Sequence, residues 1–373
     1  MFREIKGQDR ALKVIQQAIA SERVSQAYLF HGIDGVGKFT TALYFGMALN
    51  CLSESEFKPC GVCNSCRKFL AFDHPDFIYL FPAPNMNITV DGEIDKSEDQ
   101  MQYMAYIRNK IETPWKDYFF KRSIGIRRDA ITMLNKKLYY SMFEAKYRVC
   151  IIEDADEMNH QTANSFLKTL EEPPPSTVII LITNRLSMLL PTIVSRCQPI
   201  YFVPVSPHVI EKILVDKFHA SPENARTASR IAEGNVKRAV KLIEDEASDL
   251  RELAFEILQM ASTGKDYSFY QTIYNTKSRL SAETMNELIK YICLYIGDLN
   301  LIGEAPEQIS NVDKLDSLHN MVESIAEKDA ALLSDRIWRF LLRMEDLQRK
   351  VNGNVNTSLV LINLYLQLCK VFR

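Results

Sequence analysis

Apolar and polar positions along the first two hundred residues alternate between two patterns. Short apolar runs are typical of strands buried on both faces, and they occur at 27–30, 149–152 and 178–182. Segments with apolar residues at helical spacing stand between them, at 11–20, 38–49 and 161–170. A run of three prolines follows the last of these segments and predicts its end. The alternation predicts a parallel sheet with helices on both faces.

From Ser206 onward the pattern is helical almost throughout. Three short helical segments, at 209–218, 225–232 and 237–245, precede longer ones that end with 359–372. We therefore expect an α/β domain at 1–205, a small helical domain at 206–247 and an all-helical domain at 248–373. A polar segment at about 82–123, with a short helical pattern at 101–111, reads as an insertion into the first domain.

Composition narrows the class of protein. The 373 residues include 45 basic and 47 acidic ones, a formal charge of −2, which argues against a histone-like nucleic-acid binder. No apolar run reaches the roughly 18 residues that span a bilayer, and Met1–Lys6 does not read as a signal peptide. We expect a cytoplasmic protein without membrane partners.

The strongest chemical signal is a glycine-rich loop between a predicted strand and a predicted helix. Its pattern is Gly32-x-x-x-x-Gly37-Lys38, with a further glycine at Gly35. Small residues let backbone N–H groups close around a phosphate, and the lysine reaches the outer phosphates. The motif asks for Ser or Thr after the lysine to hold Mg²⁺, but Phe39 stands there, and Thr40 is about 100° further round the helix. ATP or ADP binding is predicted, with a weakened Mg²⁺ site.

Two acids end the next predicted strand. Phosphoryl-transfer enzymes place a carboxylate here for Mg²⁺ and often a second one to orient water. The usual order is Asp then Glu, whereas this chain has Glu153 then Asp154. Either the pair is a degenerate catalytic element, or the acids cap the following turn. Together with Phe39, the inversion predicts a weak or inactive ATPase.

A cysteine cluster follows the first helix after the loop. Cys51, Cys60, Cys63 and Cys66 have the spacing of a closed tetrahedral site, so we predict structural Zn²⁺, the alternative being free thiols. Cys150, Cys197, Cys293 and Cys369 stand alone in apolar stretches and are expected to be buried thiols.

Together with further motifs, these elements resemble the bacterial clamp loader, an AAA+ assembly within the DNA polymerase III holoenzyme. The additional motifs, in chain order, are Gly7-Gln8, His74-Pro75-Asp76, Leu167–Pro174 and Ser195-Arg196-Cys197. The resemblance is strong up to about residue 245 and weak beyond. It implies an AAA+ nucleotide-binding domain, a helical lid and a helical collar for oligomerisation, matching the three segments above.

The resemblance also implies roles for individual positions. Glu153 and Asp154 match the Walker B acids, Thr183 and Asn184 the sensor-1 region, and Lys237 the sensor-2 position, although a plain helix start remains open there. Arg196 matches the arginine finger that acts on ATP held by a neighbouring subunit. A guanidinium offers fixed, always-charged donors to the transferred phosphoryl group. The nucleotide-binding positions are Gly32, Gly35, Gly37, Lys38, Thr40 and Lys237.

Two subunit types carry this motif set, the ATP-hydrolysing gamma/tau chain and the delta-prime chain. The departures at Phe39, Glu153-Asp154 and Lys237 favour a delta-prime-like stator that helps ATP-driven loading of the sliding clamp onto primed DNA. Its implied partners are gamma/tau, delta, the clamp and DNA. The alternatives are a gamma/tau-type ATPase and, in another class, a zinc-stabilised interaction module with a relic nucleotide pocket.

The insertion and the segment after it carry aromatic residues and basic pairs. Trp115, Tyr118, Phe119 and Phe120 are expected to pack locally rather than stack on bases. Basic pairs at 121–122, 127–128 and 136–137 are either contacts to DNA phosphates or a solvated face.

Overall fold

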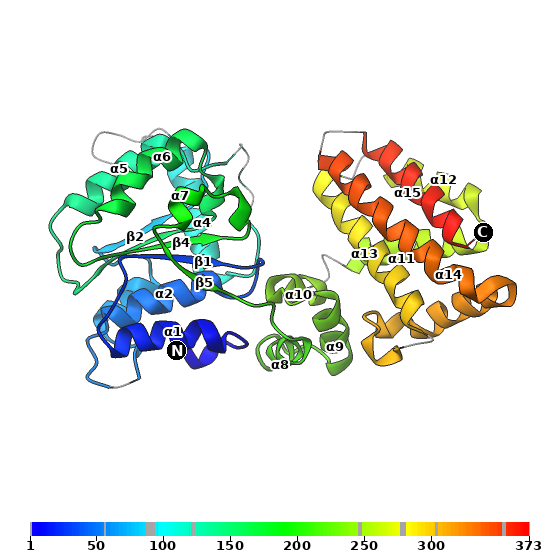
Figure 1. The fold of residues 1–373 in the computed structure, drawn as a ribbon, viewed down its shortest axis with the longest axis horizontal. Helices are drawn as coiled ribbons and strands as arrows, with labels where there is room; N and C mark the ends of the chain where they lie inside the picture. Colours follow the sequence, from blue (N-terminus) through cyan, green and yellow to red (C-terminus); the bar gives the residue numbers. More distant parts are fainter. Residues whose placement is uncertain are drawn as a thin grey trace. The chain divides into compact units, whose positions relative to one another are not determined.

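A five-stranded, wholly parallel sheet lies at the centre of the first part of the chain (Figure 1). The computed structural model describes residues 2–55, 57–86, 94, 96–118, 120, 122, 124–244, 248–276, 281–302, 305–352 and 356–372. The strand order is β2-β3-β4-β1-β5. The strands are β1 (Ala27–His31), β2 (Phe77–Leu80), β3 (Arg148–Ile152), β4 (Thr177–Thr183) and β5 (Gln198–Tyr201).

Helices cover both faces of this sheet. In Figure 1, α1 (Asp9–Ala20) and α2 (Lys38–Leu49) lie on one face, and α5 (Arg128–Tyr139) and α6 (His160–Glu171) lie on the other. Side chains of α5 and α6 form one buried cluster with inward residues of β1, β3 and β4. The remaining helices of this part are α3 (Asn64–Leu70), α4 (Ser97–Glu112) and α7 (Pro191–Val194). The predicted fold class, an α/β domain with a parallel sheet followed by helical segments, is confirmed.

The three predicted strands are present, and two further strands escaped the sequence pattern. Every residue of β3 and β4 is buried, which is why their sequences are continuous apolar runs. The edge strand β5 contains Pro199 and buries only Ile200, so it has neither an apolar run nor a regular alternation. The other edge strand, β2, is four residues long. Both edges were therefore too short or too exposed to read from the sequence.

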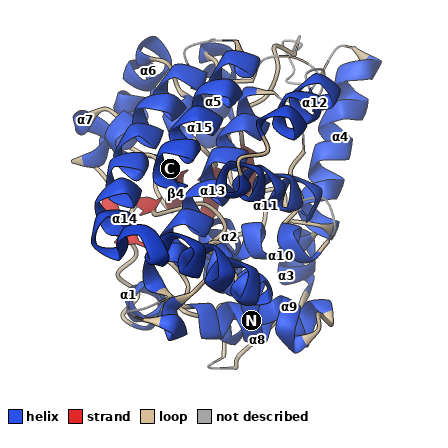
Figure 2. Ribbon diagram, turned by 90° about the vertical axis from the view of Figure 1, so that its right-hand side faces the viewer, coloured by secondary structure: helices blue, strands red, loops and turns tan. Residues whose placement is uncertain are grey.

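The second part of the chain is helical. Its elements are α8 (Pro207–Phe218), α9 (Pro222–Ile231), α10 (Val236–Ile243), α11 (Ser248–Thr263), α12 (Asp266–Thr276), α13 (Ala282–Leu301), α14 (Leu315–Asn352) and α15 (Thr357–Phe372). Helices α11, α13, α14 and α15 pack against one another around one apolar cluster, and Figure 2 shows them as an all-helical body.

The chain divides into two compact units. One contains Met1–Ile210 with Glu233–Arg238, and the other contains Glu211–Ala232 with Ala239–Arg373. The short turn 233–238 thus belongs with the sheet, although the helices on either side of it belong mainly to the other unit. The division into domains at 1–205, 206–247 and 248–373 stays a prediction.

A buried carboxylate ties the start of β2 to the segment before β3. Asp76 accepts hydrogen bonds from the backbone N–H groups of Phe143, Glu144 and Ala145 at 2.9–3.1 Å and lies 3.6 Å from the guanidinium of Arg148. Burial alone would raise the pKa of Asp76, but these bonds and the arginine charge outweigh it and lower the pKa. The contact fixes β2 beside β3, at the edge of the sheet where the insertion begins.

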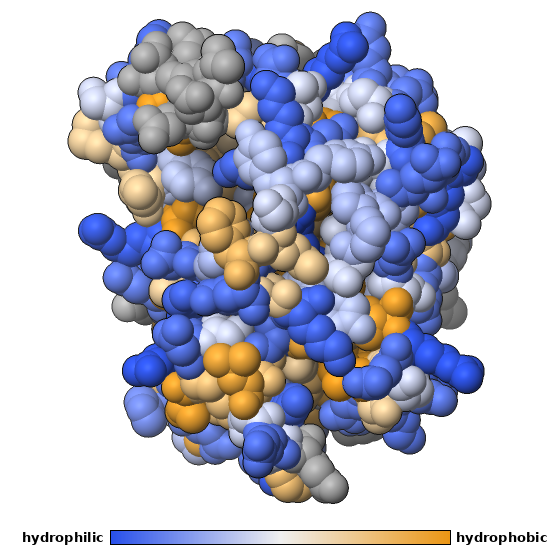
Figure 3. Space-filling model, turned by 90° about the vertical axis from the view of Figure 1, so that its left-hand side faces the viewer, coloured by the Kyte–Doolittle hydropathy of each residue, from blue (hydrophilic) through white to orange (hydrophobic). Residues whose placement is uncertain are grey.

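The surface is mixed in character. Figure 3 shows apolar patches interrupted by charged and polar side chains on one face. Within the described ranges, no helix is both long and apolar enough to cross a membrane.

Candidate nucleotide site and cysteine cluster

The carboxyl ends of three parallel strands bring most of the predicted site residues to one edge of the sheet. The glycine-rich loop follows β1, Glu153 and Asp154 follow β3, and Thr183 ends β4. Since β4 lies between β1 and β3, the loop and the acids face each other across the end of β4. This edge is where ligands bind in open α/β sheets.

The loop has the conformation that its glycines allow. Gly37 has a φ of 90° and precedes α2, whose N-terminus therefore opens on the loop. The ammonium of Lys38 donates to the carbonyl oxygens of Gly32 at 2.9 Å and Ile33 at 2.5 Å. Burial lowers the pKa of Lys38 to about 8, against the opposing effect of nearby acids led by Asp34. A bound phosphate would take the place of these two carbonyl oxygens as the lysine's acceptor.

Gly35 fits against the turn that precedes α10. Its φ is 68°, and a Cβ atom there would lie 1.8 Å from the Oδ1 atom of Asn235. The carbonyl oxygen of Gly35 accepts from the N–H of Val236 at 3.1 Å. No side chain fits at position 35, so the close approach of loop and turn depends on this glycine.

The residues at the ends of β3 and β4 are hydrogen-bonded to each other. Asn184 donates to Asp154 at 3.2 Å, and Thr183 donates to Asp156 at 2.6 Å. Arg185 also pairs with Asp156, at 2.6 Å. The structure therefore brings both predicted sensor-1 positions to the acids, and Asp156 joins the site as a third acid that the sequence reasoning missed.

Glu153 has both carboxylate oxygens engaged. Its Oε1 atom lies 2.6 Å from the ammonium of Lys110 in α4, and its Oε2 atom accepts a short hydrogen bond from the hydroxyl of Tyr79 in β2. The pair is largely withdrawn from solvent, because the Lys110 side chain is 15% exposed and that of Glu153 is 16% exposed. Burial and the charge of Glu153 hold the pKa of Tyr79 well above its ordinary value, so its hydroxyl remains a donor.

Phe39 belongs to the same group of contacts. Its ring packs against Tyr79 at a centroid distance of 5.2 Å, and the ammonium of Lys110 lies 4.2 Å from its centroid. Thr40, the next residue, is half-buried in α2. The position that would offer a hydroxyl to a metal therefore presents an aromatic face to a lysine.

These residues do not fit Mg²⁺. Magnesium requires near-octahedral oxygen ligands and is held in nucleotide sites by carboxylates and a hydroxyl. Here the hydroxyl position is Phe39, and the first acid is bound to an ammonium and a phenol. These residues therefore support no metal-dependent reaction at this site.

Lys237 also lies at the site. Its ammonium forms a short ion pair with Asp117 of the insertion and lies 3.7 Å from Asp34 in the glycine-rich loop. Its side chain is 24% exposed. The first turn of α10 thus places a cation beside the loop; its role as a sensor-2 residue stays a prediction.

Arg196 lies elsewhere. It follows α7 and precedes β5, at the amino edge of the sheet, where it donates to Glu171 at 2.9 Å and to the carbonyl oxygen of Thr192 at 2.9 Å. A third of its side chain is exposed. The structure does not bring Arg196 to the chain's own glycine-rich loop.

The four clustered cysteines converge as their spacing predicted. The sulfur atoms of Cys51, Cys60, Cys63 and Cys66 all lie within 4.8 Å of one another, and those of Cys60 and Cys66 are 4.0 Å apart. Tetrahedral zinc with Zn–S bonds of about 2.3 Å places its sulfurs about 3.8 Å apart, so the cluster could hold a metal with small shifts.

Backbone hydrogen bonds favour the thiolate of Cys60, whereas burial raises the pKa of the Cys66 thiol. The N–H groups of Cys60, Cys63 and Cys66 point at the sulfurs of Cys51, Cys60 and Cys63, respectively, at 3.3–3.4 Å. Hydrogen bonds from the backbone of Val62 and Cys63 lower the pKa of Cys60 to about 6. A lowered thiol pKa favours the form that binds metal.

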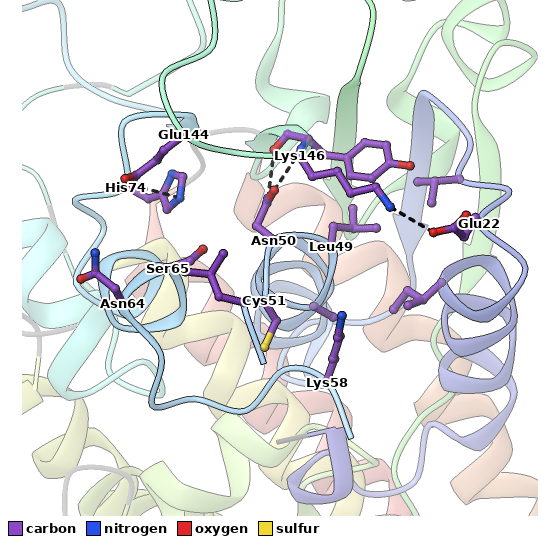
Figure 4. Close-up of a pocket in the computed structure, with 15 residues that line it drawn as sticks. Glu22, Leu49, Asn50, Cys51, Lys58, Asn64, Ser65, His74, Glu144 and Lys146 are labelled. Carbon is purple, nitrogen blue, oxygen red and sulfur yellow. Dashed lines mark hydrogen bonds and ion pairs between the residues drawn. The ribbon is translucent and has the colours of Figure 1, made fainter. Parts of the chain in front are cut away.

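The cluster is attached to the sheet domain beside a cavity of about 370 Å³ (Figure 4). Asn50, next to Cys51, donates to the carbonyl oxygen of Tyr147 and accepts from its N–H, both at 2.9 Å. His74 lies across this cavity, 3.7 Å from Glu144, and its Nδ1 atom accepts from the N–H of Asp76. It is therefore turned to the loop before β3.

Sequence reasoning did not identify the residues that the insertion supplies to the site. Lys110 and Asp117 carry no motif, and their partners stand 43 and 120 positions further along the chain. The predicted local packing of the aromatic residues is found for Tyr118, which meets Tyr106 edge to face, and for Phe120, which stacks on it. Phe119 and Lys121 lie outside the described residues.

The pKa of Asp154 makes a prediction about stability. Burial, followed by the charges of Glu153 and Asp156, raises this pKa to about 7. A raised carboxyl pKa stabilises the fold at acid pH, and that contribution is lost as pH rises through the folded value. The free energy of unfolding of Asp154→Asn, measured relative to that of the parent, should therefore rise by about 2 kcal/mol between pH 5 and pH 8. Denaturant unfolding at both pH values measures this gain.

The exposed Asp73, changed to Asn, is the control and should show no such trend. An equal effect of Asp154→Asn at the two pH values would contradict the assignment.

Comparison with known proteins agrees with this geometry. The family model described as DNA polymerase III, delta subunit, matches residues 7–206. The delta′ subunit of DNA polymerase III from Bacillus subtilis is 28% identical over 364 residues, covering 97% of this chain and 96% of that protein. The tau subunit from the same organism is 23% identical over 299 residues, covering 78% of this chain but only 46% of tau.

Among solved structures, a gamma-subunit-related protein from Thermotoga maritima aligns over 97% of this chain and 100% of its own, with 16% identity and a TM-score of 0.40. The family match spans more than half of the sequence, and it covers the loop, the acids, the cysteine cluster and Arg196. The chain therefore belongs to the DNA polymerase III delta-subunit family, the clamp-loader subunits that its sequence motifs predicted.

Proposed function

We propose that this chain is a delta′-type stator of a clamp loader, which supplies Arg196 to ATP held by a neighbouring subunit. By this means it helps the ATP-driven placement of a sliding clamp on primed DNA. Its partners in this role are gamma/tau and delta subunits, the clamp and the DNA. The observation that carries the proposal is the separation of Arg196 from the chain's own nucleotide site.

The register of β5 against β1 gives the scale of that separation. Gln198 is level with Tyr28, and Tyr201 is level with His31, so the loop after β1 lies beyond the carboxyl end of β5. Arg196 precedes β5, whose four residues Gln198–Tyr201 alone span about 10 Å at 3.3 Å per residue. An arginine side chain cannot cross that distance. Arg196 therefore suits a phosphate presented by another subunit at the amino edge of the sheet.

The occupied acid at the chain's own site supports an accessory role. A subunit that hydrolyses ATP needs a carboxylate free to hold its metal, whereas Glu153 is bound to Lys110 and Tyr79. This weighs against the gamma/tau-type alternative. The backbone N–H groups of the loop and the ammonium of Lys38 could still donate hydrogen bonds to the phosphates of a nucleotide.

Exposed basic residues offer a place for DNA phosphates. Arg127, Arg128, Lys136 and Lys137 are all exposed at the start and along the outer side of α5. Contacts of this kind position a protein on a duplex without reading its sequence.

We further propose that the cysteine cluster holds a structural Zn²⁺. All four donors are sulfur, the set that a closed zinc site uses, and no position is left for a reacting water. Zinc would fix the loop from Cys51 to Cys66, and so join the end of α2 to α3.

Replacing Arg196 tests the central role. In a reconstituted loader, Arg196→Ala should slow single-turnover ATP hydrolysis at the adjoining site by about 10³-fold, the lower end of what arginine fingers contribute. Arg196→Lys should restore only part of the rate, because lysine lacks the planar fork of donors. Rapid-quench measurements with clamp and primed DNA present give these rates.

Arg226→Ala, at an exposed position of α9, is the matched control and should leave the rate unchanged. An assembled loader containing Arg196→Ala that hydrolyses ATP at the parental rate would rule out this role.

The zinc proposal predicts one Zn²⁺ per chain, measured by mass spectrometry of metals. Cys60→Ser and Cys63→Ser should each lose the metal and lower the melting temperature, because zinc binding supplies about 10–16 kcal/mol in small zinc-binding peptides. Cys293→Ser, in α13, should keep it. A folded parental chain that takes up no zinc would contradict the proposal.

A further inference from the structure

Two departures from the ATPase pattern and the unassigned insertion meet at one ammonium group. Phe39 replaces the expected hydroxyl, Glu153 replaces the expected aspartate, and α4 comes from the insertion. None of these three features alone would indicate a function. Lys110 contacts both of the substituted side chains, which makes them parts of one arrangement.

The surroundings of Lys110 are those of a bound cation. A carboxylate oxygen lies 2.6 Å from its nitrogen, and the ring of Phe39 lies at 4.2 Å. Only 15% of the side chain is exposed. The side chain of Glu153 is one methylene longer than that of the aspartate expected there. A positive charge thus lies at the carboxylate that a nucleotide-binding ATPase uses for its divalent ion.

Aromatic stacking fixes the helix that carries Lys110. The ring of Tyr106, one turn earlier in α4, stacks on Phe81 just after β2, with centroids 3.9 Å apart. The hydroxyl of Tyr106 is 2.9 Å from that of Tyr79, the second partner of Glu153. The ring of Phe120 stacks against both Tyr106 and Phe81, with centroids 5.5 Å and 6.3 Å away. Lys110 is therefore placed by packing against the sheet rather than by its ion pair alone.

The insertion makes a second contact with the site. Asp117 pairs with Lys237, which also lies near Asp34 of the glycine-rich loop. The insertion thus contributes a cation to the acidic side of the site and an anion to its basic side. Both contacts lie within the unit that contains the sheet.

We propose that Lys110 is a built-in cation that takes the place of the divalent metal, so that this site accepts nucleoside phosphates only in metal-free form and does not hydrolyse them. The inference deepens the proposed function, since it rests on the glycine-rich loop as a phosphate site. It does not depend on Arg196. In a stator, such a site keeps its structure whether or not Mg²⁺ is present.

The experiment measures Mn²⁺ binding to the zinc-loaded full chain by electron paramagnetic resonance. The parental chain should show no Mn²⁺ site that depends on Glu153, so Glu153→Gln should leave its Mn²⁺ binding unchanged. Lys110→Met should gain a site at least tenfold tighter than any in the parent, and Lys110→Met with Glu153→Gln should lose it again. Lys110→Arg, which keeps the charge, should gain nothing.

Arg108→Met is the matched control, because it removes an exposed charge from the same helix, two residues away. The proposal is overturned by tight Mn²⁺ binding in the parent that Glu153→Gln abolishes. It is equally overturned if folded Lys110→Met, checked by circular dichroism, gains no site. The comparison of parent with Glu153→Gln decides the matter even where Lys110→Met fails to fold. Because the Arg196 experiment reads hydrolysis at a neighbouring subunit, either proposal can fail without the other.

Discussion

An ammonium and a carboxylate, those of Lys110 and Glu153, lie 2.6 Å apart at the carboxyl edge of the sheet. Removing two charges from water costs several kcal/mol per ion, and their attraction offsets it only when further contacts satisfy both groups. Here the hydroxyl of Tyr79 satisfies the second carboxylate oxygen, and the ring of Phe39 faces the ammonium. Loss of either charge would leave the other buried and unpaired. The insertion is therefore bound into the chemistry of the site.

This pairing explains why the chain keeps one half of a nucleotide site and lacks the other. The glycine-rich loop, with its glycines at positive φ and its inward lysine, retains the features that hold phosphates. The acidic half is closed to a metal. Meanwhile Arg196 lies at the opposite end of the same sheet, and the length of β5 separates it from the level of the loop. A rigid sheet that holds these two features apart is well suited to a subunit that senses or completes a neighbour's site rather than its own.

Much of this could be predicted from the sequence, for identifiable reasons. Central strands buried on both faces are mostly apolar runs, so β3 and β4 could be predicted. The phosphate loop could also be predicted, because it requires glycines at fixed positions. The cysteine cluster could be predicted because its four cysteines lie within sixteen residues of one another. Local spacing was enough for all of these features.

The missing parts depend on contacts between distant segments. Edge strands such as β5 are half exposed and give no regular pattern. Lys110 sits among polar residues of a helix with a weak apolar stripe, so nothing in its neighbourhood marks it. Lys110 matters at the site because the fold brings Glu153, from another segment, into contact with it. A sequence can show that a catalytic residue has been replaced, but only the packed structure shows what has replaced its partner.

Mg²⁺-ATP turnover by the purified chain alone, measured beside equilibrium nucleotide binding on the same sample, shows whether this site hydrolyses ATP. We expect turnover at the background rate, with or without bound nucleotide, because Glu153 is already paired with Lys110. Steady turnover that Lys38→Ala abolishes would contradict it. That result would mean that the chain hydrolyses ATP at its own site, as a gamma/tau-type subunit does.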